Sequence, residues 1–566
     1  MKKGTKITLI VLASILAFGI IVFVCADVVI SRLAMKEVNK ALSALPPEYG
    51  EASCGDIHVR LFSGTASVMD LHFYYRGESV SKKDSTARPG IDIHVERIDV
   101  GRFFYAALFN HRILVSDLNI VRPSAELWLD DKNPETCFPQ IPKDKKLDSV
   151  KHANPFLERA DLLHARINHA TFKMHSLRTK LDMDADSISL KVNNLAYDFC
   201  DSTFHYNDSV YRFSLEHAAI IFPDGRMGME VNDIAHRDQG EFKLGYTRIY
   251  NTMNRWKLGE IVKEPVTWMD MKLESVEIAP FNPIRKALAQ DYTLDNIKAV
   301  VSHMDVFRDT RYPPVRPFPM PQEAIMAIPV PLLIKTVNAD IKLIDVELAS
   351  TKTNCGKLKL KNIHADVKNI SNRKGAKLVA SGTCPVEKGK ANASFSMTMN
   401  KACEFGLDIH ATNIDIAFLN PFLRPLIGIT MDCHLDTLDT HYTGDDVTSK
   451  GTFRMLYHGF DAKVHKEDDV PFKVITKNAG IINSVANSLL PKSNPTSVDI
   501  RPREYYVEWK RDIWSPFPLY LFGACINGAM KTFLPGLFVH EQVSSKVQQK
   551  ERAKEKADEK ALKKQK

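Results

Sequence analysis

The feature that most constrains the fold of this chain is a strict alternation of apolar and polar side chains. Between Ala391 and Asn400, apolar residues fill every odd position and small polar residues fill every even one. Successive side chains of a β-strand point to opposite faces of a sheet, so this segment predicts a strand with one apolar face. Residues Ile91–Glu96 and Val337–Leu343 alternate in the same way, which is typical of antiparallel sheets.

Helical patterns are fewer than strand patterns. An amphipathic helix is expected from Ser31 to Leu45, and the two prolines that follow would end it. The remaining helices are expected at Phe281–Ala289, Pro321–Met326, Ala479–Leu490 and Phe517–Thr532. The sequence therefore predicts a mainly β protein with a few short helices.

An uncharged segment from Ile7 to Ala26 predicts a membrane-spanning helix. It would be about 30 Å long, which matches the thickness of a bilayer hydrocarbon core. The residues expected in the membrane include Ile7, Leu12, Leu16, Ile20, Phe23 and Ala26. A signal peptide cleaved before Asp27 is the alternative, but its apolar region would span only about 7–15 residues.

Positive charge flanks this segment on one side. Lys2, Lys3 and Lys6 precede it, and no acidic residue does. Cationic residues stay on the cytoplasmic side of a membrane, so the N-terminus is expected in the cytoplasm and the rest of the chain across the bilayer.

Composition divides the chain into six segments. Prolines at 313, 314, 317, 319 and 321 mark a junction between two β-rich halves. We expect a cytoplasmic stub and anchor at 1–31, an N-terminal β-rich region at 32–310, the junction at 311–332, a C-terminal β-rich region at 333–515, an apolar segment at 516–540 and a charged tail at 541–566.

Charge and motifs exclude several classes of function. The net charge is +8, of which the first six residues carry +3 and residues 541–566 carry +4, so the body retains about +1 and has no basic footprint for nucleic acid. No P-loop, H-E-x-x-H or G-x-S-x-G motif occurs, and the nine cysteines form no C-x-x-C pair. We therefore expect no enzymatic activity, no cofactor and no metal.

One group of metal-ligating residue types lies on a single predicted strand. Asp432, His434 and Asp436 share strand parity and could face one ion. A solvated polar strand face explains the same pattern, and it is the interpretation that the sequence favours.

Three segments carry a resemblance to a known family. The predicted anchor is followed by an amphipathic helix and then by strands. Residues Ile91–Asp130 combine a strand, a short helical step and a strand that closes on a P-x-x-x-L phrase at Pro123–Leu127. Residues Ile429–Val464 contain a strand pair ahead of a G-x-x-x-x-x-Y phrase at Gly451–Tyr457. In this order, the segments resemble the AsmA-like family of bacterial envelope proteins.

The resemblance implies an elongated, curved antiparallel β-sheet that forms an open apolar groove. AsmA-like proteins are grouped with the repeating β-groove, bridge-like lipid-transfer proteins, and they are linked to phospholipid movement between membranes and to outer-membrane integrity. The expected location is the inner membrane of a Gram-negative-type envelope, with a single span and the bulk in the periplasm. The expected partners are phospholipid acyl chains, the inner membrane, and outer-membrane or envelope proteins.

An apolar sheet face must be covered, because leaving it wet forfeits about 25 cal/mol per Å². Two arrangements satisfy this requirement: the β-rich halves cover each other in a closed core, or the sheet forms a trough that acyl chains fill. The candidate lipid-facing residues are Ala393, Phe395, Met397 and Met399.

The apolar C-terminal segment offers further candidates. The residues proposed to contact a membrane are Phe517, Leu519, Phe522 and Leu534. Capping of the open end of the sheet is the alternative role for this segment. Two functions follow as hypotheses: assistance of phospholipid transport and envelope maintenance, or a non-catalytic structural or assembly role for outer-membrane proteins. An envelope hydrolase is the third.

Overall fold

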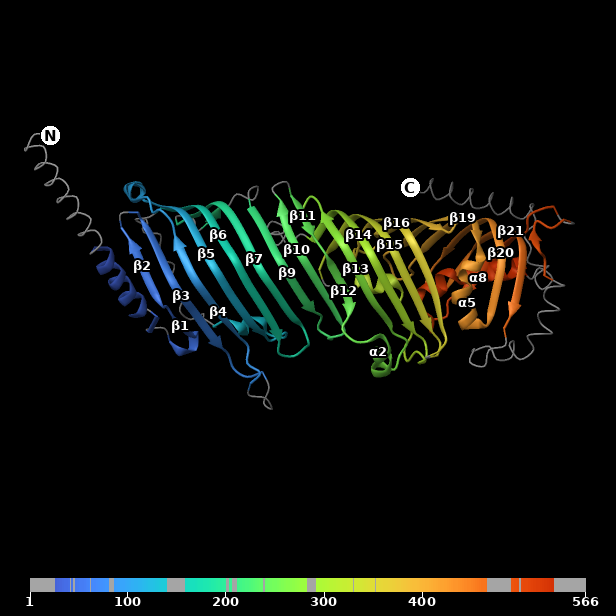
Figure 1. Cartoon of the computed structure of the whole chain (residues 1–566), viewed down its shortest axis with the longest axis horizontal. Coiled ribbons are helices and arrows are strands. Elements are labelled where there is room, and N and C mark those ends of the chain that lie inside the picture. Colours follow the sequence, from blue (N-terminus) through green and yellow to red (C-terminus); the bar gives the residue numbers. More distant parts are fainter. Residues whose placement is uncertain are drawn as a thin grey trace, which may run out of the picture. The chain divides into compact units, whose positions relative to one another are not determined.

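The computed structural model describes residues 26–533, except 41, 44–45, 62, 81–85, 140–157, 200–202, 206–210, 238–239, 282–291, 329, 352, 466–489 and 498–499. The chain forms two compact units, Met1–Thr252 (unit 1) and Met253–Lys566 (unit 2), and strands dominate both (Figure 1). The mainly β prediction is therefore confirmed. The proline-rich residues 311–332 lie inside unit 2, where they lead from one strand to the next.

Unit 1 is a sheet in which neighbours in sequence are mostly neighbours in space. β1 and β2 both pair antiparallel with β3, which pairs with β4, and β4 pairs with β5. A second antiparallel series follows the order β6, β7, β9, β10 and β12. Its strands are β1 (Glu51–Ser53), β2 (Asp56–Arg60), β3 (Thr65–Arg76), β4 (Gly90–Val100), β5 (Arg112–Leu129), β6 (Arg159–Ser176), β7 (Asp182–Asp198), β8 (Thr203–His205), β9 (Tyr211–Ile221), β10 (Met227–Arg237), β11 (Glu241–Leu244) and β12 (Thr247–Asn251).

Unit 2 repeats this layout. Consecutive strands from β15 to β21 pair antiparallel, and β22 and β23 both pair with β21. Its strands are β13 (Thr267–Ile278), β14 (Tyr292–Asp309), β15 (Leu332–Ala349), β16 (Cys355–Ser371), β17 (Lys377–Val386), β18 (Gly389–Thr398), β19 (Phe405–Asp415), β20 (Ile429–Gly444), β21 (Thr448–Val464), β22 (Ser493–Asn494) and β23 (Glu504–Lys510).

One pair of strands in each unit is parallel, which corrects the prediction of a purely antiparallel sheet. β5 runs parallel to β6, and β14 runs parallel to β15. A parallel pair needs a crossover connection rather than a hairpin turn. The proline-rich segment supplies this connection between β14 and β15, so it joins two adjacent strands instead of separating two sheets.

The helices are short and mostly lie beside the sheets. The described part of the chain contains helical residues 26–40, α2 (Arg255–Val262), α4 (Pro321–Met326), α5 (Asn420–Ile427) and α8 (Phe517–Phe533), with short 3-10 turns η1 (Pro47–Tyr49), η2 (Tyr105–Asn110), η3 (Pro134–Cys137) and η4 (Ile416–Leu419). Thus α4 matches the predicted bounds, and α8 begins at the predicted residue. The helices expected at Phe281–Ala289 and Ala479–Leu490 fall almost wholly outside the described residues.

The predicted membrane anchor lies outside the described residues, apart from Ala26. Among the residues that the structure does describe, no helix has both the length and the apolar character needed to span a bilayer. The helix of residues 26–40 borders the free edge of β2, where the Asp27 carboxylate accepts from the Leu61 amide at 2.8 Å and the Ser31 hydroxyl accepts from the Val59 amide at 2.8 Å. These side chains accept from one amide of β2 and from the amide of Leu61 just after it, at an edge that would otherwise invite pairing with another chain.

Candidate functional site: the apolar faces of the two sheets

Unit 1 carries continuous rows of apolar side chains across its strands. Residues directly opposite each other in a sheet point to the same face. One such row crosses β3, β4, β5, β6, β7 and β9 through Val68, Ile98, Ile120, Ile167, Leu190 and Phe213. A second crosses eight strands through Tyr75, Ile91, Leu127, Met174, Met183, Ile220, Met229 and Ile249. One face of the unit 1 sheet is therefore apolar from strand to strand.

This face stays partly open among the described residues. Of the fourteen side chains in the two rows, only Ile91 is buried, and the others remain partly accessible to solvent. A shallow depression of about 280 Å³ lies on the same sheet, and its lining is almost wholly apolar: Val100, Ile113, Val115, Leu118, Leu162, Leu195 and Tyr197 belong to it. Among the described residues, the two rows of unit 1 thus present an apolar surface that stays accessible to solvent.

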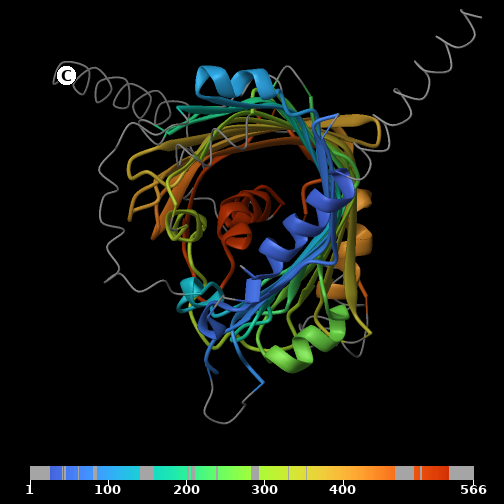
Figure 2. The same ribbon diagram turned by 90° about the vertical axis from the view of Figure 1, so that its left-hand side faces the viewer.

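In unit 2, the corresponding face is covered toward the C-terminal strands. A row from β18 to β23 contains Phe395, Leu407, Tyr442, Gly451 and Val507. Leu407, Tyr442 and Val507 are at most 3% exposed, in contrast to the open rows of unit 1. The cover is α8, which lies inside the curve of the yellow-to-orange strands of this unit (Figure 2).

Small residues let α8 approach the sheet closely. A Cβ atom added to Gly523 would lie 2.2 Å from the Trp509 indole nitrogen, and one added to Gly528 would lie 2.2 Å from Phe453 Cγ. Aromatic side chains flank this contact, because the Phe533 ring stacks on Phe460 with centroids 4.2 Å apart. Hence the glycines and aromatic residues of the C-terminal segment form a closed core with the sheet.

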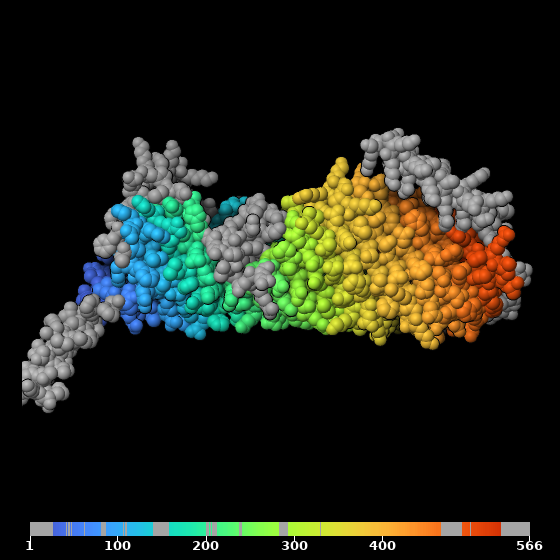
Figure 3. Space-filling view, turned by 90° about the horizontal axis from the view of Figure 1, so that it is seen from above, coloured from blue at the N-terminus to red at the C-terminus, as the bar shows by residue number. Residues whose placement is uncertain are grey.

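The crossover between β14 and β15 covers the neighbouring strands. Met320, which precedes α4, is fully buried in a cluster with Met397, Met399, Phe405 and other residues. The crossover is attached to the segment before α8, since the Arg511 guanidinium donates to the Phe318 carbonyl at 2.6 Å. The space-filling view shows these strands from one side, in yellow to orange (Figure 3).

The four candidate lipid-facing residues occupy β18 and its C-terminal end, in three different environments. Met397 and Met399 are buried beneath the crossover, with 3% and 0% of their surface exposed. Phe395 is half-buried and lies 6.2 Å from the ring of Phe517, whereas Ala393 is exposed. Protein side chains therefore cover most of this predicted set. The open apolar rows lie instead in unit 1, whose strands show the same alternation in the sequence.

The candidate membrane-contacting residues divide between the two sides of α8. Phe517 packs against Phe395 and Phe405, so it belongs to the core. Leu519 and Phe522 are 49% and 45% exposed on the other side, together with Ile526 and Met530. Leu534 lies outside the described residues.

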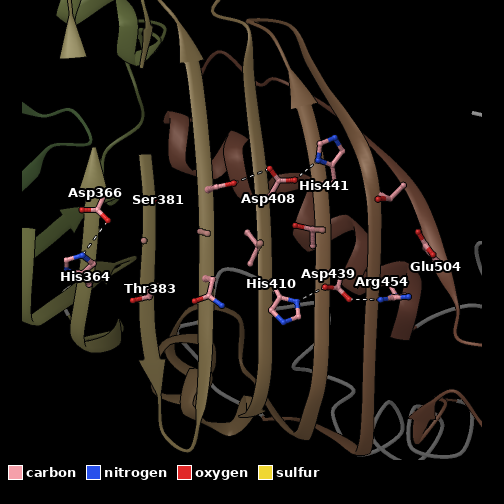
Figure 4. A pocket seen from close by; sticks show the side chains of 17 residues that line it. His364, Asp366, Ser381, Thr383, Asp408, His410, Asp439, His441, Arg454 and Glu504 are labelled. Atoms are coloured by element: carbon pink, nitrogen blue, oxygen red, sulfur yellow. Dashed lines mark hydrogen bonds and ion pairs between the residues drawn. The ribbon is translucent and has the colours of Figure 1, made fainter. Parts of the chain in front are cut away.

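The opposite face of unit 2 is polar. A cleft of about 620 Å³ crosses β16 to β21 there, and Figure 4 shows the side chains that line it. Asp439 accepts from His410 Nδ1 at 2.6 Å and from Arg454 at 2.8 Å, and Asp408 accepts from His441 and from Ser394. These cross-strand pairs are typical of a solvated polar strand face.

Few groups outside the apolar faces offer reactive chemistry. The seven cysteines in the described part of the chain are free thiols. Burial raises the pKa of Cys525 to about 11 and that of Cys433 to about 12, so both thiols stay protonated and are poor nucleophiles.

One group of side chains has the spacing of a metal site. Ligand atoms of His303, Asp305 and Asp345 lie within 4.8 Å of one another. The His303 imidazole, however, already contacts Asp345 at 3.0 Å, and the Lys359 ammonium contacts the other oxygen of that carboxylate at 3.2 Å. A cation here would have to displace Lys359, so we assign these residues to an ion-pair network.

No protein-family model, curated protein or solved structure matches this chain. Any functional assignment therefore depends on the chemistry of the two faces. The polar face is internally paired, whereas the apolar face of unit 1 lacks a protein partner among the described residues.

Proposed function

We propose that this chain is an AsmA-like protein, anchored in the inner membrane, that holds phospholipid acyl chains against the apolar face of its sheet. In this role it would assist phospholipid transport between membranes and maintenance of the outer membrane, with its bulk in the periplasm. The observation that carries the proposal is the pair of open apolar rows across unit 1. The anchor and the location follow from the sequence and its family resemblance.

The physical argument is one of burial. Each methylene of an acyl chain gains about 0.8 kcal/mol when it leaves water for an apolar surface, so a chain laid along several strands would bind by contact area alone. The rows contain only apolar side chains apart from the Tyr75 hydroxyl, so they impose no fixed position along the strands. Such a surface suits a ligand that moves, and it needs no catalytic group.

The test places a photo-crosslinking amino acid at Ile120, in the middle of one apolar row. The matched control is Asn119, the preceding residue of β5, which faces the polar side and donates to Asp99 at 3.4 Å. Crosslinked phospholipid at position 120 and none at position 119 supports the proposal. Equal capture at both positions, or none at position 120, would refute it.

A second role is favoured by the closed core of unit 2. There α8 covers the sheet as the second layer of an ordinary globular domain does. We propose as the alternative that the chain is a non-catalytic structural or assembly factor for outer-membrane proteins. A stable complex with an envelope protein, purified free of lipid, would support this role over the first.

A further inference from the structure

Two imidazoles meet on the polar face of unit 2, where β20 pairs with β21. His434 and His458 are directly opposite in the register, and their ring centroids are 4.9 Å apart. The pairing of these strands is irregular between Asp432 and His434 and again between Leu435 and Thr437. Such bulges redirect side chains locally, so the sequence parity of this strand does not reveal the contact.

A carboxylate orients each of these imidazoles. His434 Nδ1 lies 2.6 Å from Asp415 Oδ1, and His458 Nδ1 lies 3.0 Å from Asp436 Oδ1. A carboxylate only accepts hydrogen bonds, so Nδ1 must be the protonated nitrogen of both rings. In the neutral imidazole, Nε2 then carries the free lone pair. Neither Nε2 has another hydrogen-bond partner among the residues that the structure describes.

A carboxylate on Nδ1 is also the arrangement found around many histidine ligands of metal ions. Histidine ligands commonly donate their second ring nitrogen to a carboxylate, which fixes the tautomer and makes the ligating nitrogen more basic. With Zn–N bonds of about 2.0–2.1 Å and tetrahedral angles, two imidazoles on one ion would have ring centroids roughly 5 Å apart. The observed separation of 4.9 Å matches this value.

The charge around the two rings favours a cation. Asp432 and Asp461 are opposite each other next to the histidine pair, and Asp415 and Asp436 stand behind the rings. Lys463 and Lys492 both contact Asp461, at 3.7 Å each. Four carboxylates therefore face two ammonium groups, which leaves a negative excess while the imidazoles are neutral.

We propose that His434 and His458 bind one divalent transition-metal ion of the Zn²⁺ or Cu²⁺ class through their Nε2 atoms, with Asp415 and Asp436 as positioning residues. Imidazole nitrogen suits these ions, whereas Mg²⁺ and Ca²⁺ require oxygen ligands. The ion would join β20 to β21 on the face opposite α8. His410 and His441 are each held by a carboxylate in the same way, but among the described strands no second imidazole lies opposite either ring.

The test uses the purified full chain in detergent, with ZnCl2 as the probe and MgCl2 as the comparison. Titration calorimetry gives the affinity for wild type, His434→Gln, His458→Gln and the matched control His410→Gln. His458 is an exposed side chain on a polar face, so glutamine keeps its solubility and leaves the fold intact. The Cu²⁺ electron paramagnetic resonance spectrum counts the nitrogen ligands independently.

We expect Zn²⁺ to bind wild type and His410→Gln equally, to bind either ligand variant at least tenfold more weakly, and Mg²⁺ not to bind. Asp436→Asn should lower the affinity about 10–100-fold, since it removes the carboxylate that orients His458. The Cu²⁺ spectrum should show two nitrogens in wild type and one in His458→Gln. Unchanged affinity in both ligand variants, equal binding of Mg²⁺, or absence of Zn²⁺ binding to wild type would overturn the proposal.

Discussion

The docking of α8 can be tested by adding one methyl group, at Gly528. In an exposed helix, a glycine-to-alanine change stabilises the protein by roughly 0.5–1 kcal/mol, because alanine loses less conformational freedom on folding. In this structure the new Cβ would lie 2.2 Å from Phe453 Cγ and 2.7 Å from Phe453 Cβ. Rotating the ring does not relieve the second contact, since Cβ is fixed to the strand. The substitution therefore forces α8 away from the sheet.

The expected magnitude follows from these two opposing effects. Overpacking a well-packed core costs typically about 1–3 kcal/mol. Subtracting the helix-propensity gain leaves Gly528→Ala roughly 1 kcal/mol less stable than wild type, while an undocked helix would make it more stable. The sign of the stability change therefore distinguishes an α8 that packs on the sheet from one that does not.

The assay is thermal and urea-induced unfolding of the full chain, followed by tryptophan fluorescence. A second variant, Phe453→Ala, removes the Cγ atom that the added methyl group would meet at 2.2 Å, and the double variant completes a cycle that isolates this contact. We expect the cost of Gly528→Ala to shrink when Phe453 is replaced. Stabilisation by Gly528→Ala, or strict additivity in the cycle, would refute the described packing of α8.

Three further substitutions test two ion pairs and the contact between the helix of residues 26–40 and the edge of β2. Arg178 holds the pKa of the buried Asp130 carboxyl well below its usual range, so Arg178→Ala should lower the free energy of unfolding at pH 7. Because the pKa of Asp130 is depressed in the folded protein, the stability difference between wild type and Arg178→Ala should shrink as the pH falls below about 4. Urea unfolding at pH 7 and pH 3 measures this difference. A difference that does not change with pH would contradict the pairing of Arg178 with Asp130. The hydrogen bond that His364 Nδ1 donates to the Asp340 carboxylate raises the pKa of His364. NMR titration should therefore show a lower His364 pKa in Asp340→Asn, and an unchanged pKa would exclude the pairing. The stability from this pair is present below the unfolded pKa of about 6.5 and is lost as the pH rises through the folded pKa. Asp27→Ala should speed hydrogen exchange of the Leu61 amide, which loses its acceptor, and unchanged exchange would argue against the contact.

The sequence predicts individual strands well because their alternation is a local property. Residues 391–400 alternate strictly, and the structure contains β18 there, with Met397 buried and Ser394 exposed. What covers the apolar face of a strand is not a local property. Whether Phe395 faces lipid or α8 depends on a helix that lies more than a hundred residues away in the sequence. Alternation alone cannot separate these cases.

Two other features escape sequence reasoning for physical reasons. The parallel pairs depend on the path of the crossover segments, and the prolines after Asp309 indicate only that regular structure is interrupted. The meeting of His434 and His458 depends on two irregularities in the pairing of β20 with β21. The acidic residues around His434 are the sequence signal that could have indicated this contact. A solvated polar strand face explains the same acidic residues equally well.

The parallel pairs also determine the order in which each sheet can form. Hairpins between consecutive antiparallel strands close short loops and need little chain entropy, so β3–β4–β5 and β15–β16–β17 are local units. The pairings β5–β6 and β14–β15 close much longer segments, from Leu129 to Arg159 and from Asp309 to Leu332. Each unit thus combines local hairpins with a parallel pairing that closes a long segment. Until that pairing is complete, β5 and β14 each expose an unpaired edge to other chains.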